Sequence, residues 1–96
     1  METEVRIGQV VYVKSGRDKD RNFIVYRIVD ESYVEIVDGK VRRLAKPKKK
    51  KLKHLKLLSG CLDKLAEKIK AGKTIHDSEI RSALRNFSEE KEEADV

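Results

Sequence analysis

The sequence predicts a mainly β protein in which a small curled sheet is followed by two helices. Three runs rich in β-branched and aromatic residues, separated by turn residues, occupy the first part of the chain. After residue 58, the alternation typical of strands gives way to the three- and four-residue apolar spacing of helices. A chain of 96 residues, 42% charged and 39% hydrophobic, is expected to form one small domain with a thin core.

The first three strands are predicted at residues 7–14, 23–29 and 33–37. Ser15-Gly16 closes the first strand with a turn. Asp38-Gly39 follows the third strand and is a strong hairpin signal, because both central positions of a type I′ turn need positive φ. We therefore expect a three-stranded meander that turns sharply into a fourth strand.

These strands carry apolar residues on both faces. In the second strand the two alternating sets are Ile24, Tyr26 and Ile28, and Phe23, Val25 and Val29. A sheet that curls into a small barrel, or that is covered by helices, buries both faces. The fourth strand is expected at residues 41–45 and the fifth at residues 52–57, with Pro47 and the lysines after it as their connection.

Two helices are predicted after the sheet. The apolar face of the first consists of Leu58, Leu62, Leu65 and Ile69, and Ala71-Gly72 supplies its end. Asp77 or Ser78 can cap the second, whose apolar face consists of Ile80, Ala83, Leu84 and Phe87. The two helices are expected to pair through these faces as a hairpin.

The predicted organisation is a barrel at residues 1–58, a helical hairpin at residues 59–88 and an acidic disordered tail at residues 89–96. Residues 1–58 carry 16 Lys and Arg against 8 Asp and Glu, whereas residues 59–96 carry 7 against 9. The positive field therefore belongs to the barrel. A field of this sign attracts polyanions such as nucleic acids.

No catalytic or metal-binding pattern accompanies this charge. The sequence lacks a nucleophile elbow, a phosphate-binding loop and a zinc-protease motif, so we expect neither enzyme activity nor a small-molecule substrate. Cys61, His54 and His76 lie at no recognised metal-ligand spacing, so we expect no cofactor. Within the first helix pattern, Cys61 is better explained as a small buried hydrophobe than as a nucleophile.

The single cysteine and the polar start of the chain, which lacks the apolar segment of a signal peptide, predict a cytoplasmic protein. No apolar run is long enough to predict a membrane span.

The strongest functional signal is a basic segment, free of acids, from Lys40 to Lys56. Lysine runs often serve only to keep a surface solvated, which is the competing explanation. Arginines join this run, and a guanidinium group forks onto phosphate oxygens and stacks on bases. The RNA-binding residues predicted in the segment are Arg42, Arg43, Lys46, Lys48, Lys49, Lys50, Lys51, Lys53 and His54. The first loop and its start add Lys14, Arg17, Lys19 and Arg21.

The sequence also resembles the KOW-domain family of RNA-binding proteins. The similarity rests on residues 8–19, residues 25–30, Asp38-Gly39, Val41-Arg42-Arg43 and Lys53-His54-Leu55. Over residues 5–58 the chain is most similar to the ribosomal large-subunit protein fourteen-e family of archaea and eukaryotes, and to small bacterial KOW-domain proteins with a two-helix tail. The resemblance implies a small SH3-like β-barrel that binds ribosomal RNA through loops and basic strand edges. It also makes the helices candidates for contacts with ribosomal proteins.

One position departs from the family pattern, because Asp20 stands where the family usually has glycine. Glycine adopts positive φ there, and aspartate is among the few other residues that tolerate it, so the turn is expected to survive. An acid in this loop weakens a contact with phosphate. The first loop therefore ranks below the lysine segment as an RNA contact.

Two other functions fit the same features. The barrel and the helical hairpin could serve as a protein-interaction adaptor, and the basic surface could bind DNA without specificity. Membrane attachment is weaker, because no lipidation site or apolar insertion face accompanies the basic run. Tyr12, Phe23, Tyr26 and Tyr33 are candidates for stacking on bases, although aromatic residues in strands are more often part of the core.

Overall fold

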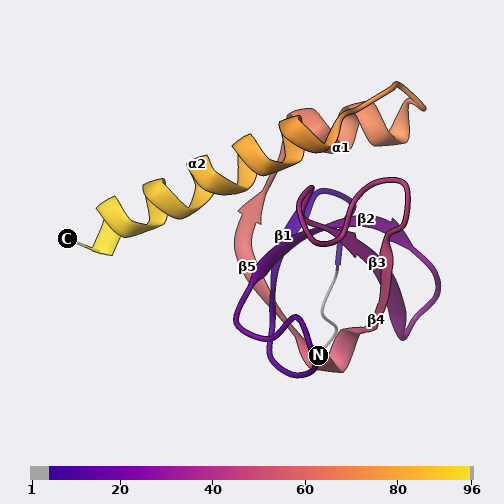
Figure 1. Cartoon of the computed structure of the whole chain (residues 1–96), viewed down its shortest axis with the longest axis horizontal. Helices are drawn as coiled ribbons and strands as arrows, with labels where there is room; N and C mark the ends of the chain where they lie inside the picture. The colour runs from indigo at the N-terminus through magenta and orange to yellow at the C-terminus, as the bar shows by residue number, and fades with distance from the viewer. Residues whose placement is uncertain (1–4, 96) are drawn as a thin grey trace.

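The computed structural model describes residues 5–95 and consists of one curled antiparallel sheet with two helices against its outer face (Figure 1). The strands are β1 (Gln9–Val13), β2 (Asn22–Ile28), β3 (Tyr33–Val37), β4 (Lys48–Lys51) and β5 (Leu55–Cys61). The helices are the 3-10 turn η1 (Leu52–His54), α1 (Asp63–Lys70) and α2 (Asp77–Asp95). The expected mainly β architecture, with a sheet followed by helices, is confirmed.

The order of strands explains the curl. The sheet runs β4-β3-β2-β1-β5, so its two edge strands are consecutive in the chain. Only η1 separates them, and the sheet must roll until its edges approach each other. The result is the half-barrel seen in Figure 1. The predicted meander is confirmed, because β1 pairs with β2 and β2 pairs with β3, both antiparallel.

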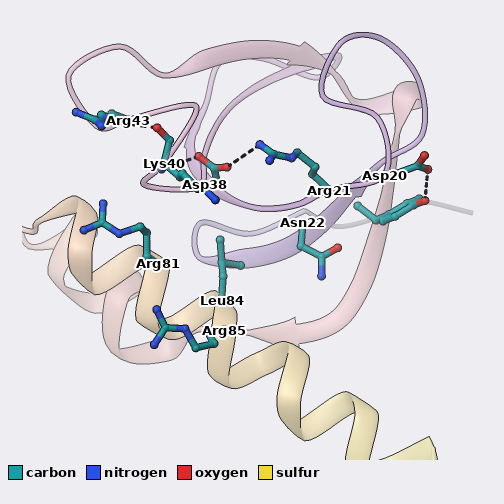
Figure 2. Close-up of a pocket in the computed structure, with 10 residues that line it drawn as sticks. Asp20, Arg21, Asn22, Asp38, Lys40, Arg43, Arg81, Leu84 and Arg85 are labelled. Atoms are coloured by element: carbon teal, nitrogen blue, oxygen red, sulfur yellow. Dashed lines mark hydrogen bonds and ion pairs between the residues drawn. The ribbon is translucent and has the colours of Figure 1, made fainter.

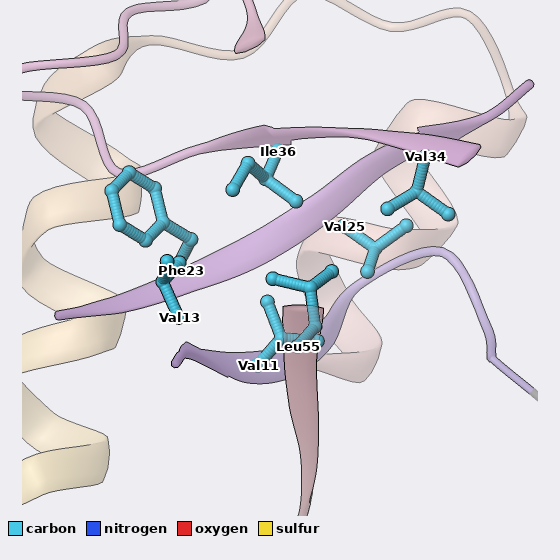
Figure 3. Close-up of a cluster of buried hydrophobic side chains, with 7 residues drawn as sticks. All are labelled: Val11, Val13, Phe23, Val25, Val34, Ile36 and Leu55. Carbon is cyan, nitrogen blue, oxygen red and sulfur yellow. The ribbon is translucent and has the colours of Figure 1, made fainter. Parts of the chain in front are cut away.

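Apolar side chains fill both faces of the sheet. The inner cluster consists of Val11, Val13, Phe23, Val25, Val34, Ile36 and Leu55 (Figure 3). The outer cluster consists of Val10, Ile24 and Val37 from the strands and Leu65, Ile80 and Leu84 from the helices. Burying one such side chain contributes about 1.5–3 kcal/mol, so a chain of this size needs both layers. The two-sided apolar pattern thus has two causes, the curl on one face and the helices on the other.

The predicted turn and fourth strand are wrong. Residues 41–45 form no strand, and at Asp38-Gly39 only Gly39 has positive φ (78°), so no type I′ turn forms. Instead, Oδ1 of Asp38 accepts hydrogen bonds from the N–H groups of Lys40, Val41 and Arg42 at 2.8–3.0 Å. An aspartate that caps successive N–H groups in this way stabilises a compact loop in place of a hairpin.

The fourth strand is the lysine run itself, which was expected to be a connection. In β4, Lys48 to Lys51 pair with Ile36 to Tyr33 of β3. Lysine has a low strand propensity, but an edge strand needs only one paired neighbour, and charged side chains suit a solvent-facing edge. Tertiary pairing therefore overrides composition at this position.

The boundary between sheet and helices also lies later than predicted. Residues 52–54 form η1, and β5 extends to Cys61, so Leu58 and Cys61 lie in a strand and not in the first helix. The cause is pairing with β1, where Val11 lies opposite Leu57 and Gln9 opposite Cys61. Helix α1 begins only at Asp63.

The second helix begins as predicted but is capped differently. Asp77 is its first residue, and its Oδ1 accepts the N–H of Leu44 at 2.8 Å instead of capping the helix. The carboxylate of Glu79 reaches back to the N–H of His76 at 2.9 Å, which satisfies one of the free donors of the first turn. Ile80 and Leu84 are buried, as their spacing predicted.

The two helices are joined directly by Lys68 and Glu79, whose Nζ and Oε2 lie 2.8 Å apart. Their apolar faces meet over the sheet in the outer cluster, so the two helices are anchored to the curled sheet as well as to each other. Helix α2 continues to Asp95, through the segment that the sequence predicts as a disordered tail. The segment contains neither Gly nor Pro and is rich in Glu, a good helix former, so propagation from a formed helix is favourable.

Candidate nucleic-acid interface

The β1–β2 loop, residues 14–21, lies at the centre of the basic surface. Asp20 adopts positive φ (69°), so the prediction that aspartate can replace glycine in this turn is confirmed. The N–H of Asp20 donates to the carbonyl of Val13 at 2.9 Å, and its Oδ1 accepts the hydroxyl of Tyr12 at 2.5 Å. This hydrogen bond to the carboxylate raises the pKa of Tyr12, because ionising the phenol would remove the donor. The acid expected to disturb phosphate binding is thus engaged with the barrel.

Two ion pairs connect this loop to the loop between β3 and β4, residues 38–47. Nε of Arg42 lies 3.0 Å from Oδ2 of Asp18, and the Asp18 side chain is only 5% exposed. Nη1 of Arg21 lies 3.8 Å from Oδ2 of Asp38. Arg42 therefore has a structural role in holding the two loops together, in addition to the phosphate contact predicted for it.

The lysine run does not form one ridge. In β4, Lys48 and Lys50 lie opposite Ile36 and Val34, which face the inner cluster, so these two lysines point to the inner rim of the half-barrel. The alternate residues Lys49 and Lys51 lie on the outer face of the sheet, with Nζ 4.8 Å and 5.9 Å from the ring centre of Tyr33. Strand geometry divides the run between two faces.

The inner-rim lysines meet the β1–β2 loop near η1. A Cβ built on Gly16 would lie 2.6 Å from Nζ of Lys50, so this ammonium group rests against the loop backbone. The N–H of Lys14 donates to the carbonyl of His54 at 2.9 Å. We call the β1–β2 loop together with the parts of β4 and η1 that contact it the loop surface; the basic residues of these segments are Lys14, Arg17, Lys19, Lys50, Lys53 and His54. Lys46 is exposed in the β3–β4 loop.

On the other side of the β1–β2 loop, a groove of about 870 Å³ lies between the loops and helix α2 (Figure 2). We call it the α2 groove. Its basic lining residues are Arg21, Lys40 and Arg43 from the loops and Arg81 and Arg85 from α2. The other lining residues are Asp20, Asp38, Tyr12, Asn22 and Leu84. Five basic side chains against two acidic ones give the groove a net positive charge.

The walls of the α2 groove are held in place by contacts between helix and loop. Nη1 of Arg81 donates to the carbonyl of Gly39 at 2.6 Å, and Asp77 accepts the N–H of Leu44. Gly39 is packed so closely against the carbonyl of Asp77 that a Cβ would clash with it. The helix and the β3–β4 loop therefore form one continuous rim.

Arg81 and Arg85 are not among the RNA-binding residues predicted from the sequence, because residues 59–96 carry more acidic than basic side chains. The available signal was their four-residue spacing, which places both on one side of a helix, next to the buried position of Leu84. Only the docking of α2 on the barrel shows that this side faces the basic loops. Of the predicted residues, Arg21 and Arg43 lie in the α2 groove, and the loop surface holds a separate group.

Cys61 lies near the end of β5, partly exposed. Burial, followed by the nearby Asp63 carboxylate, raises the pKa of its thiol, which lowers the fraction of reactive thiolate. Among the side chains described, no cluster of three or more potential metal ligands is found. Within residues 5–95, no helix combines the length and apolar character needed to cross a membrane.

Comparison with models of known protein families and with curated proteins finds no match to this chain.

Proposed function

We propose that this chain is an RNA-binding domain, an SH3-like barrel of the KOW type, which docks on folded ribosomal RNA. The observation that carries the proposal is the gathering of basic side chains from three separate segments around the β1–β2 loop. These segments are the loop itself, residues 38–54, and helix α2. Cations that are distant in sequence but adjacent in space favour contact with an extended polyanion over simple solvation of a lysine run.

The chemistry is electrostatic docking without bond making or breaking. Exposed lysines such as Lys14 and Lys53 replace condensed counterions along the phosphate backbone, and the arginines supply directional contacts. Because the base edges of an RNA helix lie in a deep narrow groove, a rigid barrel recognises backbone shape and junctions more than paired sequence. Folded RNA with loops and bends is therefore the preferred target over a straight duplex of DNA.

Salt titration tests the proposal. If about five phosphates are engaged, the log–log slope of RNA affinity against salt is about −3.5 to −4.5. Fluorescence anisotropy with a labelled fragment of ribosomal RNA, between low and high salt, measures it. A slope near zero contradicts electrostatic RNA binding and leaves a protein-interaction role as the better explanation.

Single substitutions locate the surface. Lys14→Ala and Lys53→Ala remove exposed cations of the loop surface, and each is expected to reduce the magnitude of the slope by slightly less than one. Lys73→Ala removes an exposed lysine from the α1–α2 connection, and serves as the matched control with an unchanged slope. Co-sedimentation with ribosomal particles, and competition by duplex DNA, distinguish ribosomal RNA from a non-specific polyanion.

A further inference from the structure

The α2 groove differs from the loop surface in what lies between its cations. Tyr12 and Asn22 lie opposite each other on β1 and β2, so their side chains are neighbours on the outer face of the sheet. Leu84 from α2 lines the same groove but is only 9% exposed, so it contributes an apolar edge at the base of the groove. An aromatic ring, an amide and an aliphatic side chain thus line a groove whose other members are mainly basic.

These three side chains match the requirements of an exposed nucleobase. A base stacks on an aromatic ring or packs on an apolar surface, and an amide offers two donors and an acceptor to its edge. The hydrogen bond from Tyr12 to Asp20 fixes the ring before any ligand arrives, which lowers the entropy cost of stacking. A paired base presents neither its face nor its Watson–Crick edge, so these groups have nothing to contact in a duplex.

The rim of the groove matches the backbone of the same ligand. Arg81 and Arg85 are one helical turn apart, about 6 Å along the axis of α2. Lys40 and Arg43 line the groove from the β3–β4 loop (Figure 2). The two acids of the groove already have partners, Asp20 in Tyr12 and Asp38 in its own loop and Arg21, which leaves Lys40, Arg43, Arg81 and Arg85 as the cations that face no acid in the groove. Phosphates can therefore bind on both sides of a base held in the groove.

We propose that the α2 groove binds an unpaired segment of RNA, such as a loop or bulge, with one base stacked on Tyr12 and touching the exposed edge of Leu84. Asn22 contacts the edge of that base, and Arg81 and Arg85 hold the adjoining phosphates. This inference rests on the proposed RNA-binding function and makes helix α2 part of the nucleic-acid interface. The groove is open to solvent along one side, so a nucleotide and its neighbouring phosphates can enter it without a change in the fold.

The test compares two RNAs with equal numbers of phosphates, a stem with an unpaired loop and a fully paired duplex. Anisotropy titrations use the full chain and the variants Arg85→Ala and Asn22→Ala. Loss of one charged contact is expected to weaken binding of the stem–loop about tenfold for Arg85→Ala. Asn22→Ala carries no charge change and is expected to weaken the stem–loop several-fold while leaving the duplex unaffected. Circular dichroism confirms that each variant is folded.

Lys53→Ala, on the loop surface, is the matched control, and should weaken both RNAs to the same extent. Equal losses on both RNAs with Arg85→Ala and Asn22→Ala, or no loss with either variant, overturn the inference while RNA binding itself stands. Displacement of the stem–loop by polyglutamate as effectively as by RNA also overturns it, because an acidic peptide has no base to offer. Absence of salt-dependent binding to any RNA overturns the proposed function as well.

Discussion

The ion pair between Asp18 and Arg42 gives a sharp prediction about how the two loops are held together. The Asp18 side chain is 5% exposed and the Arg42 side chain is 27% exposed, so the two partners depend on the pair unequally. Arg42→Ala leaves a buried carboxylate without its cation, whereas Asp18→Asn leaves a guanidinium that can still reach water. Removing one partner of a fully buried pair costs about 3–5 kcal/mol, and partial exposure here lowers this to about 2 kcal/mol for Arg42→Ala. Asp18→Asn is expected to cost about 1 kcal/mol.

Thermal unfolding followed by circular dichroism measures the effect. A domain of this size shifts its Tm by about 4–8 °C per kcal/mol, so Arg42→Ala should lower Tm by roughly 8–16 °C and Asp18→Asn by about half as much. Arg43→Ala is the control, because this neighbouring arginine is exposed and its Nε donates to the carbonyl of Lys40 at 3.3 Å, a weak hydrogen bond at the surface. Its Tm should change little. Equal losses for the two partners, or a larger loss for Asp18→Asn, would refute the reasoning from burial.

Two further predictions concern the contacts of α2. Gly39→Ala should lower Tm clearly more than Gly72→Ala. Both glycines have positive φ, which costs alanine about 1–2 kcal/mol. At Gly39 the added Cβ would also clash with the carbonyl of Asp77, whereas at Gly72 it would meet no atom within 4 Å. Equal effects in thermal melts would show that the close packing at Gly39 does not matter. The hydrogen bond from Lys68 lowers the pKa of Glu79 in the folded state below its usual value of about 4.3. The ionised Glu79 therefore stabilises the fold at neutral pH, and this stabilisation is lost as the pH falls through the lowered pKa. The Tm difference between the parent chain and Glu79→Gln should therefore shrink between pH 7 and pH 3, and a difference that is the same at both values would contradict this.

The sequence predicts the fold where side-chain pattern and backbone preference agree. Residues 33–37 form a strand with the predicted limits, because four of the five are β-branched or aromatic and turn residues lie on both sides. At residues 48–51 the pattern fails, since four lysines carry no alternation and the strand exists only through its pairing with β3. Leu58 fits the apolar spacing of a helix and also the alternation of a strand. Pairing with β1 decides between them, and no local signal reports that pairing.

The candidate site was predictable in composition but not in arrangement. The excess of cations in the barrel and the positive φ of Asp20 follow from residue types. Which lysines of β4 face the inner side of the sheet and which face the outer side depends on the register of β4 against β3. The ion pair of Arg42 with Asp18 forms only because the β1–β2 and β3–β4 loops lie next to each other. The inclusion of Arg85 in the groove depends on how α2 docks. Each of these is a long-range property, which residue spacing along one segment does not encode.

The place of β1 between β2 and β5 has a consequence for how the chain folds during synthesis. One edge of β1 can pair as soon as residues 22–28 have emerged, but the other must wait for residues 55–61. A nascent chain that stops short of these residues exposes an unpaired edge next to buried positions such as Val11 and Val13. Because non-local pairing is slow and must precede closure of the inner cluster, the curled sheet is expected to form in one late step once β5 leaves the exit tunnel.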